Sequence, residues 1–486
     1  MLKKISAVLA ALAMTGSSTA QAWNDDSVNY NTYDNEIYYS IINGSSITIT
    51  GISDYTEDLV IPAEIDGLKV TKIEDNAFEG KQRLRTVKIE EGVTLAGNGV
   101  FKDCRSLKTA ELPKSLRFIG FEAFKDCVTL QRINLSCNIE LICDETFMNC
   151  FSLKEAIMPS GITRIGDRAF GFCGSLKNTD IPDTVKSIGT EAFLNCTSLE
   201  EIKLPDKLDS LGERAFSNCS NLTEIRIPDS VPIIQRNTFS HCTSLQNIIL
   251  GRNLNLILSE AFSYCTALEE IQIPDNVKEI ESWVFKNCSN LKTVYLPDNL
   301  SSLGEGVFGY CKSLDGITIP EGINAIEAQT FYECENLKEV IIPGNVKAVR
   351  RHAFYGCKNL TGAVICDGVV RIENNAFGKC SNLKTVSIPS SVREIEYNSF
   401  KGASDLNIIC EPGSYAHKHA VKYRENFRFE KEEVQDGTII IIIAVIWTTV
   451  IIAVCLACVV GIKKSRKQIT VTSGKGFDKN AEENFN

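Results

Sequence analysis

A phenylalanine recurs at a constant spacing of 23 residues through most of this 486-residue chain. A leucine follows each of these phenylalanines six residues later, and most copies carry a proline twelve residues later. A period this strict indicates a solenoid, in which each copy forms one turn and equivalent side chains stack into a shared core. Because one inserted residue would displace every later position, the constant spacing identifies the core itself. The repeated residues are Phe78, Phe101, Phe124, Phe147, Phe170, Phe193, Phe216, Phe239, Phe262, Phe285, Phe308, Phe331, Phe354, Phe377 and Phe400.

One copy of the repeat contains the signals for its own secondary structure. The segment Leu199–Pro205, "LEEIKLP", alternates apolar and polar residues and ends at a proline, which is typical of a short strand with one face turned inward. The segment Asp209–Cys219, "DSLGERAFSNC", contains Gly212 and is too short for more than one or two turns of helix. The sequence therefore predicts an α/β solenoid of about 15 units, built from short parallel strands and short helical turns.

Most copies of the repeat also carry a cysteine three residues after the phenylalanine, from Cys104 to Cys380. These thiols would form a row in which each has two equivalent neighbours, so an odd row of 13 cannot pair completely. The pattern favours free, buried thiols, while disulfides and a metal array stay open as alternatives. Lys81 and Ala403 replace the cysteine in the first and last copies, as a role in the core predicts. Outside this row, Cys137 and Cys143 are close enough in sequence to form a disulfide.

The repeat unit "IGTEAFLNCTSLEEIKLPDKL", Ile188–Leu208, resembles the BspA-like leucine-rich repeats, a family of secreted and surface proteins. The resemblance extends from Ile73 to about Leu406, and the segments on either side resemble the caps of that family. It implies a curved solenoid of strands and short helices, and a role in adhesion or host contact. We therefore expect an N-terminal cap at 23–66, leucine-rich repeats at 67–406, and a C-terminal cap with a juxtamembrane segment at 407–436.

The two ends of the chain indicate secretion and membrane anchoring. Lys3 and Lys4 precede an apolar run and a small-x-small site, which predicts a signal peptide at 1–22. Residues 437–462 are uncharged and rich in Ile and Val, which predicts a transmembrane helix. Basic residues follow it and acidic residues precede it, so we expect a cytoplasmic tail at 463–486 and the repeats outside the cell. This pattern predicts a single-pass protein of the cell surface with its N-terminus outside.

Composition and motifs give no sign of bond-making chemistry. A net charge of -10 argues against a nucleic-acid partner, which would need a basic face. The sequence has no phosphate-binding loop and no nucleophile elbow, so it predicts a protein that is not an enzyme and uses no cofactor. His417 and His419 could share a metal ion, but a solvated cap is favoured. Among the eight Asn-x-Ser/Thr sites, Asn195, Asn218 and Asn287 are expected to form bends rather than to carry sugar.

Comparison between the copies separates the scaffold from a variable surface. The residue ten after each phenylalanine should point away from the core, and it varies freely, whereas the residue two before it is often Glu. Exposed apolar residues beside polar ones are typical of a protein-contact surface, although neutral variation on a solvated face gives the same pattern. The candidate partner-binding residues are Glu201, Glu224, Arg226, Ile249, Glu270, Gln272, Tyr295, Thr318, Ile341 and Val364.

These observations predict a surface protein that mediates adhesion or recognition through an extended sheet face, without catalysis. The expected partner is an extracellular protein or glycan on a host, a matrix or a neighbouring cell. The alternative is a surface receptor whose short cytoplasmic tail couples ligand binding to uptake or signalling.

Overall fold

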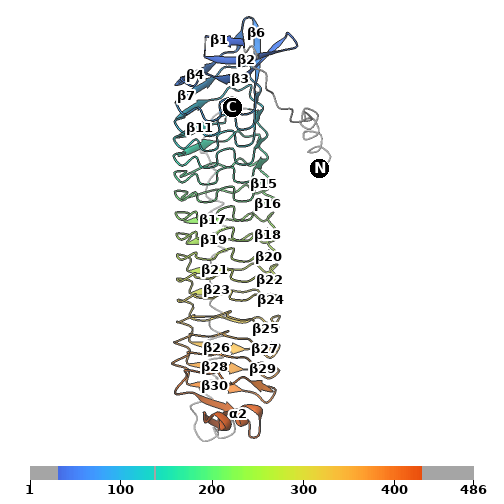
Figure 1. Cartoon of the computed structure of the whole chain (residues 1–486). Helices are drawn as coiled ribbons and strands as arrows, with labels where there is room; N and C mark the ends of the chain where they lie inside the picture. Colours follow the sequence, from blue (N-terminus) through green and yellow to red (C-terminus); the bar gives the residue numbers. More distant parts are fainter. Residues whose placement is uncertain (1–30, 35, 136–137, 430–486) are drawn as a thin grey trace, which may run out of the picture. The chain divides into compact units, whose positions relative to one another are not determined.

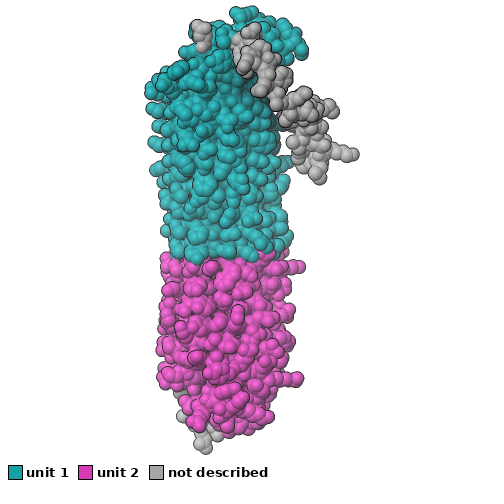
Figure 2. All heavy atoms as spheres, viewed as in Figure 1, with its two compact units in different colours: residues 1–267 teal, residues 268–486 magenta. Residues whose placement is uncertain are grey.

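The computed structural model describes residues 31–429, apart from residues 35, 136 and 137 (Figure 1). The chain divides into two compact units, Met1–Ala267 and Leu268–Asn486 (Figure 2). The predicted signal peptide, transmembrane helix and cytoplasmic tail lie outside the described residues, as does Cys137. Within the described ranges, no helix has both the length and the apolar character needed to cross a membrane.

The first unit begins with six strands that lead into the repeats, of which β4 pairs with the first row and β6 with the second. Two antiparallel pairs, β1–β2 and β2–β3, lead to β6, which lies parallel to β3 and begins the parallel stack. These strands are β1 (Asn31–Tyr33), β2 (Ile37–Ile42), β3 (Ser46–Ile52), β4 (Asp58–Ile61), β5 (Glu64–Ile65) and β6 (Leu68–Ile73).

The repeats of the first unit contribute two rows of parallel strands (Figure 1). The first row follows the repeat leucines and contains β7 (Thr86–Ile89), β9 (Thr109–Glu111), β11 (Arg132–Asn134), β13 (Glu155–Ile157), β17 (Glu224–Arg226) and β19 (Asn247–Ile249). Single bridges at Asn178 and Glu201 connect β13 to β17. The second row contains β8 (Leu95–Ala96), β10 (Phe118–Ile119), β12 (Leu141–Ile142), β14 (Arg164–Ile165), β15 (Ser187–Ile188), β16 (Ser210–Leu211), β18 (Ile233–Ile234) and β20 (Leu256–Ile257).

The second unit repeats this plan and ends in a cap. Its first row contains β21 (Glu270–Gln272), β23 (Thr293–Tyr295), β26 (Glu339–Ile342), β28 (Gly362–Ile365), β30 (Thr385–Ile388), β32 (Asn407–Cys410) and β33 (Asn426–Phe429). Its second row contains β22 (Glu279–Ile280), β24 (Ser302–Leu303), β25 (Ala325–Ile326), β27 (Ala348–Val349), β29 (Arg371–Ile372) and β31 (Glu394–Ile395). Helix α2 (Tyr415–Tyr423) is capped at its N-terminus by Ser414, whose side chain accepts a hydrogen bond from the His417 amide.

The register of the strands confirms the solenoid. In the first unit Ile225 pairs with Ile248, and in the second unit Val340 pairs with Ala363, so each residue lies beside its equivalent one repeat later. The second row is an element that we did not predict from the sequence. Its strands in the repeats are two residues long, which is too short for an alternating pattern to appear.

The described residues of the repeats form none of the predicted short helices, and this part of the expected α/β fold is wrong. The segment around each repeat phenylalanine forms consecutive tight turns instead, since from Phe78 to Phe377 the residues two before and two after it have left-handed backbones. Around Phe193 these are Glu191 (φ 56) and Asn195 (φ 58), and a left-handed residue ends an α-helix. The Glu191 and Asn195 amides donate to Glu213 and Ser217 of the next turn, at 2.8 and 2.9 Å. These bonds between turns compensate for the strained backbone.

The core is a stack of the repeat phenylalanines, as the sequence predicted. Adjacent ring centres are 5.0–5.7 Å apart in the first unit and 5.0–5.6 Å apart in the second. Most of these ring pairs are nearly parallel; Phe193 and Phe216, for example, differ by 5°. The leucine six residues later is buried in every turn, from Leu84 to Leu406. Each turn therefore buries these two large side chains together with further aliphatic residues such as Ile188 and Leu208, and this burial stabilises the repeat.

The repeat cysteines are free thiols, and the predicted role in the core is confirmed. The thiol of Cys219 donates to the carbonyl oxygen of Phe193, one turn earlier, at 3.2 Å, and the same bond recurs in both units, for example from Cys334 to Phe308. The Cys196 amide also donates to the Phe193 carbonyl, so both lone pairs of this buried acceptor have partners. Burial raises the pKa of the Cys242 thiol to about 12, which keeps it protonated at neutral pH. A small side chain with a weak donor therefore fits this position.

Candidate functional site

The side chains that point outward from the first row of strands form the candidate partner-binding surface, which we call the first-row face. In β21, Glu270 and Gln272 are exposed while Ile271 between them is 2% exposed. The same alternation holds in β17, where Ile225 is buried between Glu224 and Arg226. All ten candidate partner-binding residues are exposed, and those that lie on strands are placed outward by the strand period.

In the first unit the pairing of strands brings four candidate residues together. Arg226 lies directly beside Ile249, and Glu201 is bridged to Glu224. The Ile249 side chain is 53% exposed, which is unusual for an isoleucine on a strand whose other side packs into a core. This part of the first-row face therefore combines two carboxylates, one guanidinium and one exposed aliphatic group.

In the second unit the first-row face is more apolar. Gln272 pairs with Tyr295, and Ile341 pairs with Val364. The exposed fractions of Tyr295, Ile341 and Val364 are 43%, 39% and 37%. Thr318 belongs to a turn of the solenoid in which no strand forms, so it is exposed but lies outside the pairing.

Two further residues extend this face, and one of them was missed. Val364 pairs with Ser387, which in turn pairs with Ile409 of β32. Ile409 lies 22 residues after Ser387, one fewer than the repeat period, so counting by 23 passes over it. Its signal was the alternation in "NIIC", which places Ile408 and Cys410 in the core.

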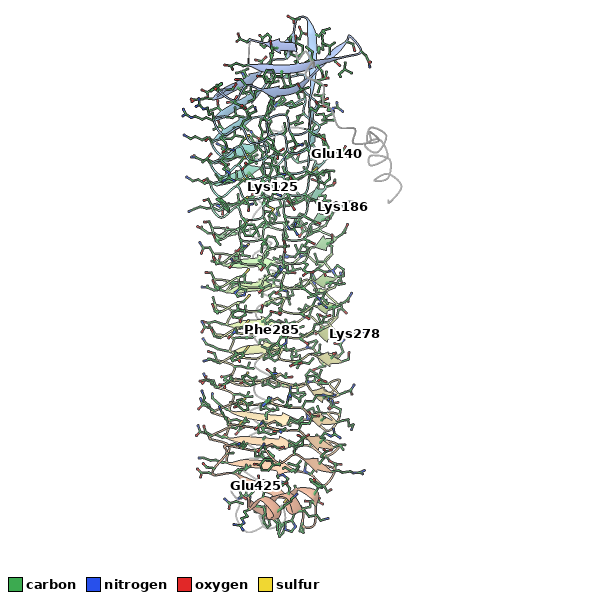
Figure 3. The ribbon with its side chains drawn as sticks, in the orientation of Figure 1. Lys125, Glu140, Lys186, Lys278, Phe285 and Glu425 are labelled. Atoms are coloured by element: carbon green, nitrogen blue, oxygen red, sulfur yellow. The ribbon has the colours of Figure 1, made fainter. Side chains whose placement is uncertain are left out.

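A separate feature of the first unit is a chain of ion pairs along the turns. Lys125, which Figure 3 labels, bridges Glu122 at 3.0 Å and Glu145 at 2.7 Å. Glu191 in the same way lies between Arg168 at 2.8 Å and Arg214 at 3.1 Å. Apart from the Lys125–Glu122 pair, which lies within one turn, these pairs connect consecutive turns and so contribute to the register of the stack.

The ion pairs predict a dependence of stability on pH. Burial alone would raise the pKa of Glu191, but hydrogen bonds from Arg168 and Arg214 outweigh it and hold the pKa below its ordinary value of 4.5. A lowered folded pKa means that the stabilisation is complete above the unfolded pKa and is lost as pH falls through the folded pKa. We expect the melting temperature to fall as the pH is lowered from about 5 to about 3, and to fall less in Glu191→Gln. Each ion pair that is lost should reduce the free energy of unfolding by about 0.2–1 kcal/mol.

Thermal unfolding of both proteins as a function of pH checks this expectation. The matched control is Glu201→Gln, which removes an exposed carboxylate that has no ion-pair partner within the described residues. Equal pH profiles for Glu191→Gln and the unmodified chain would contradict the account.

The two histidines of the C-terminal cap have separate environments. His417 Nδ1 accepts a hydrogen bond from the Gly413 amide, and its ring packs against Phe427 and Phe429. His419 is 4% exposed, with Nδ1 3.1 Å from Glu425 Oε2, so the expectation of a solvated cap is wrong for this residue. Over the described ranges, no group of three or more metal-ligating side chains could hold a metal ion.

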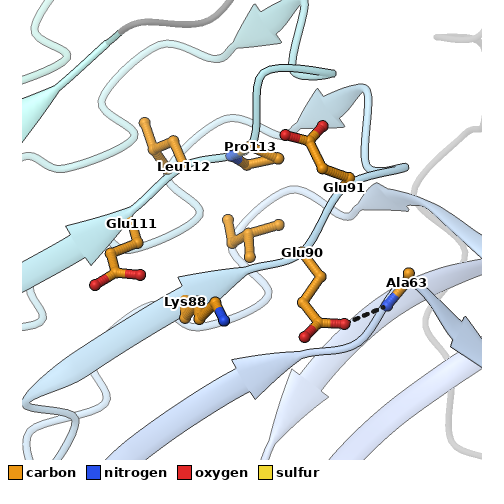
Figure 4. A pocket seen from close by; sticks show the side chains of 8 residues that line it. Ala63, Lys88, Glu90, Glu91, Glu111, Leu112 and Pro113 are labelled. Carbon is orange, nitrogen blue, oxygen red and sulfur yellow. Dashed lines mark hydrogen bonds between the residues drawn. The ribbon is translucent and has the colours of Figure 1, made fainter.

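A hollow of about 460 Å³ in the first unit is lined by three glutamates, Glu90, Glu91 and Glu111 (Figure 4). Glu90 accepts a hydrogen bond from the Ala63 amide at 3.3 Å. The amides of Lys114 and Ser115 donate to Glu91 and lower its pKa. Paired-carboxylate hydrolysis needs one carboxyl whose pKa is raised so that it can donate a proton. Glu91 is shifted in the opposite direction, so it is unsuited to act as that acid.

One family of repeats matches the chain in a comparison with known protein families. The BspA type leucine-rich repeat region matches at residues 55–177, 163–292 and 284–407, which together span more than two thirds of the sequence. Comparison with curated protein sequences gives no match.

Solved structures of bacterial leucine-rich repeat proteins resemble the fold. A leucine-rich repeat protein from Bacteroides ovatus matches with a TM-score of 0.69 and 26% identity, covering 83% of this chain and 100% of that one. A leucine-rich cell surface protein from Faecalibacterium prausnitzii matches with a TM-score of 0.46 and 25% identity, covering 82% of this chain and 98% of that one.

Proposed function

The chain belongs to the BspA-type leucine-rich repeat family, and from this membership we propose that it is a non-catalytic recognition protein of the cell surface. The proposed role is adhesion, and the proposed contact surface is the first-row face of the second unit. The partner is an extracellular protein on a host, a matrix or a neighbouring cell.

The observation that carries this proposal is the exposure of Tyr295, Ile341 and Val364 on one strand row. The scaffold does not need these side chains, because equivalent positions hold Lys203 and Asp180 in other repeats. Aromatic and aliphatic groups surrounded by polar ones are the usual composition of a protein contact surface.

The charge beside these residues favours a basic partner. Glu270 and Glu339 lie on the same row and are exposed, and no basic residue occupies the outward positions of β21, β23, β26 or β28. Complementary charge raises association rates and selects against acidic partners. We therefore expect binding to weaken as salt concentration rises.

The double substitution Tyr295→Asp with Ile341→Asp is expected to weaken binding to immobilised matrix proteins by at least about 10-fold, because it removes two contact groups and adds like charges. Both side chains point outward, so the melting temperature should stay within a few degrees of the unmodified chain. The measurement is surface plasmon resonance with the full chain against a panel of basic and acidic matrix proteins.

The matched control for this pair is Val370→Asp, since Val370 is also 39% exposed in the second unit but precedes β29 of the second row. Loss of binding in the control, or unchanged affinity in the double variant, would reject the first-row face as the contact surface.

The alternative role, a receptor that passes ligand or signal inward, depends on residues 463–486. Truncation from Lys467 to Asn486 separates the two roles in cells that display the chain. Adhesion predicts that attachment survives the truncation with no other defect. Normal attachment with a loss of uptake would favour the receptor instead.

A further inference from the structure

A groove with a volume of about 600 Å³ lies on the second row of the second unit, away from the first-row face. Its floor is formed by Ser302 of β24, Ala325 of β25 and Ala348 of β27. The strands β24 and β25 belong to separate sheets, so the groove lies across an interruption in the second row. Longer side chains occupy the same repeat position on both sides, namely Glu279 and Arg371.

The charged groups of the groove already have partners in the protein. Arg350 Nε lies 3.0 Å from Glu327 Oε2, and Lys347 Nζ donates to the Gly344 and Gly368 carbonyls at 3.1 and 3.2 Å. Glu305 accepts a hydrogen bond from Gln329. The four ionised residues among the groove's lining, two acidic and two basic, balance in charge.

The neutral polar groups of the groove are available to a ligand. Within the part of the chain that the structure describes, the hydroxyl of Ser302 and the amide of Asn324 have no hydrogen-bond partner, although both are exposed. Ser301 differs, because its hydroxyl donates to the carbonyl of Lys278, which Figure 3 labels in this unit. A balanced charge with open hydroxyl and amide groups suits a neutral, hydroxyl-rich molecule better than a polyanion.

Aromatic side chains follow one another on the turns that carry the groove, outside the residues that line it. Trp283 directly follows the groove residue Ser282 and packs over Gly306 of the next turn. Tyr310, Tyr332 and Tyr355 follow on successive turns, with ring centres 5.2 and 5.1 Å apart. Serine occupies the position of Tyr332 and Tyr355 in other repeats, at Ser217, Ser240 and Ser263, so folding does not require these rings.

We propose that this groove and its aromatic margin bind a neutral oligosaccharide. Sugar hydroxyls bond to Ser302, Asn324 and the remaining carboxylate oxygens, and the apolar faces of sugar rings pack on the aromatic side chains. This site is separate from the first-row face, so it does not depend on the proposed protein contact.

The test uses the purified full chain and calorimetric titration with chitohexaose and mannohexaose, with heparin hexasaccharide as the polyanionic comparison. We expect at least one neutral hexasaccharide to bind with a Kd on the order of 0.1 mM. The variant Ala325→Leu with Ala348→Leu fills the floor and should weaken binding by at least about 10-fold. It should fold normally, because Leu141 and Leu256 occupy the same repeat position elsewhere.

A second variant keeps the test decisive if the first is unstable. Tyr332→Ser with Tyr355→Ser should weaken binding by about 2- to 10-fold for each ring that contacts sugar. The first-row variant Ile341→Asp is the matched control and should leave sugar binding unchanged. The proposal is overturned if neither neutral hexasaccharide binds, if heparin binds better than both, or if the floor variant binds as well as the unmodified chain.

Discussion

Replacing Phe193 with alanine is expected to reduce the local free energy of unfolding by about 3–5 kcal/mol, the usual cost of removing a buried phenyl ring. Phe193 is fully buried, and its ring centre lies 5.4 Å from that of Phe170 and 5.3 Å from that of Phe216. The substitution leaves a cavity and also removes two stacked aromatic contacts, each worth about 0.5–1.5 kcal/mol beyond its buried area. Because each turn contacts only its neighbours, the loss should be concentrated in the adjacent turns.

The measurement is native-state hydrogen exchange, which resolves the opening of individual turns where a long repeat array departs from two-state unfolding. Protection should fall for the amides of residues 170–216 and stay unchanged in distant turns. The matched control is Leu194→Ser, since Leu194 is half-buried at a turn position that is serine in Ser217. A loss below about 1 kcal/mol in Phe193→Ala, or a loss as large in the control, would contradict the stacked core.

The core of this protein can be predicted from sequence because the same residue type returns at every turn. Phe193, Cys196 and Leu199 each have an equivalent 23 residues later, and only a stacked geometry requires that. The partner of the thiol could not be predicted in the same way. The carbonyl of Phe170 accepts from Cys196 across 26 residues, and backbone acceptors leave no pattern in a sequence.

The conformation of the turns around the repeat phenylalanines could not be predicted, because several residues there adopt a backbone conformation that their residue type disfavours. Glycine and asparagine are the usual left-handed residues, yet Glu191 and Arg214 take this conformation. Their backbone amides bond to the next turn at 2.8 and 3.0 Å, so tertiary bonding overrides local preference. The sites Asn195 and Asn218 are the opposite case. Both are left-handed, and the Asn218 side chain donates to Asn195, so the expectation that they form bends is confirmed.

The first-row face could be predicted wherever apolar and polar residues alternate along a strand. The outward positions of Arg226, Tyr295 and Ile341 follow from a period of two and are exposed as expected. The prediction from alternation does not extend to Thr318, where no strand forms. It also misses Ile409, because the repeat before Ile409 is one residue shorter than the others. The groove on the second row could not be predicted from the sequence. It depends on short side chains in the second-row strands, and those strands were not predicted.

Deleting one complete repeat should preserve the fold, whereas deleting part of one should destroy it. Removal of residues 192–214 joins Glu191 to Ala215, at the position that Ala192 held, so Phe216 then stacks on Phe170 and Cys219 meets the Phe170 carbonyl. Removal of residues 192–202 eliminates Phe193 and Leu199 but keeps the remainder of their turn. Every later apolar position of the first unit is then out of register with the turns before it.

Labelling of the buried thiols with iodoacetamide in both deletion proteins is the measurement that tests the stacked solenoid most directly. We expect Cys173 and Cys219 to stay unreactive in the 23-residue deletion, which should keep a cooperative thermal transition. In the partial deletion the same thiols should react rapidly, because their turns no longer pack. Equal reactivity in the two proteins would contradict the claim that a constant repeat, stacked turn upon turn, is what folds this chain.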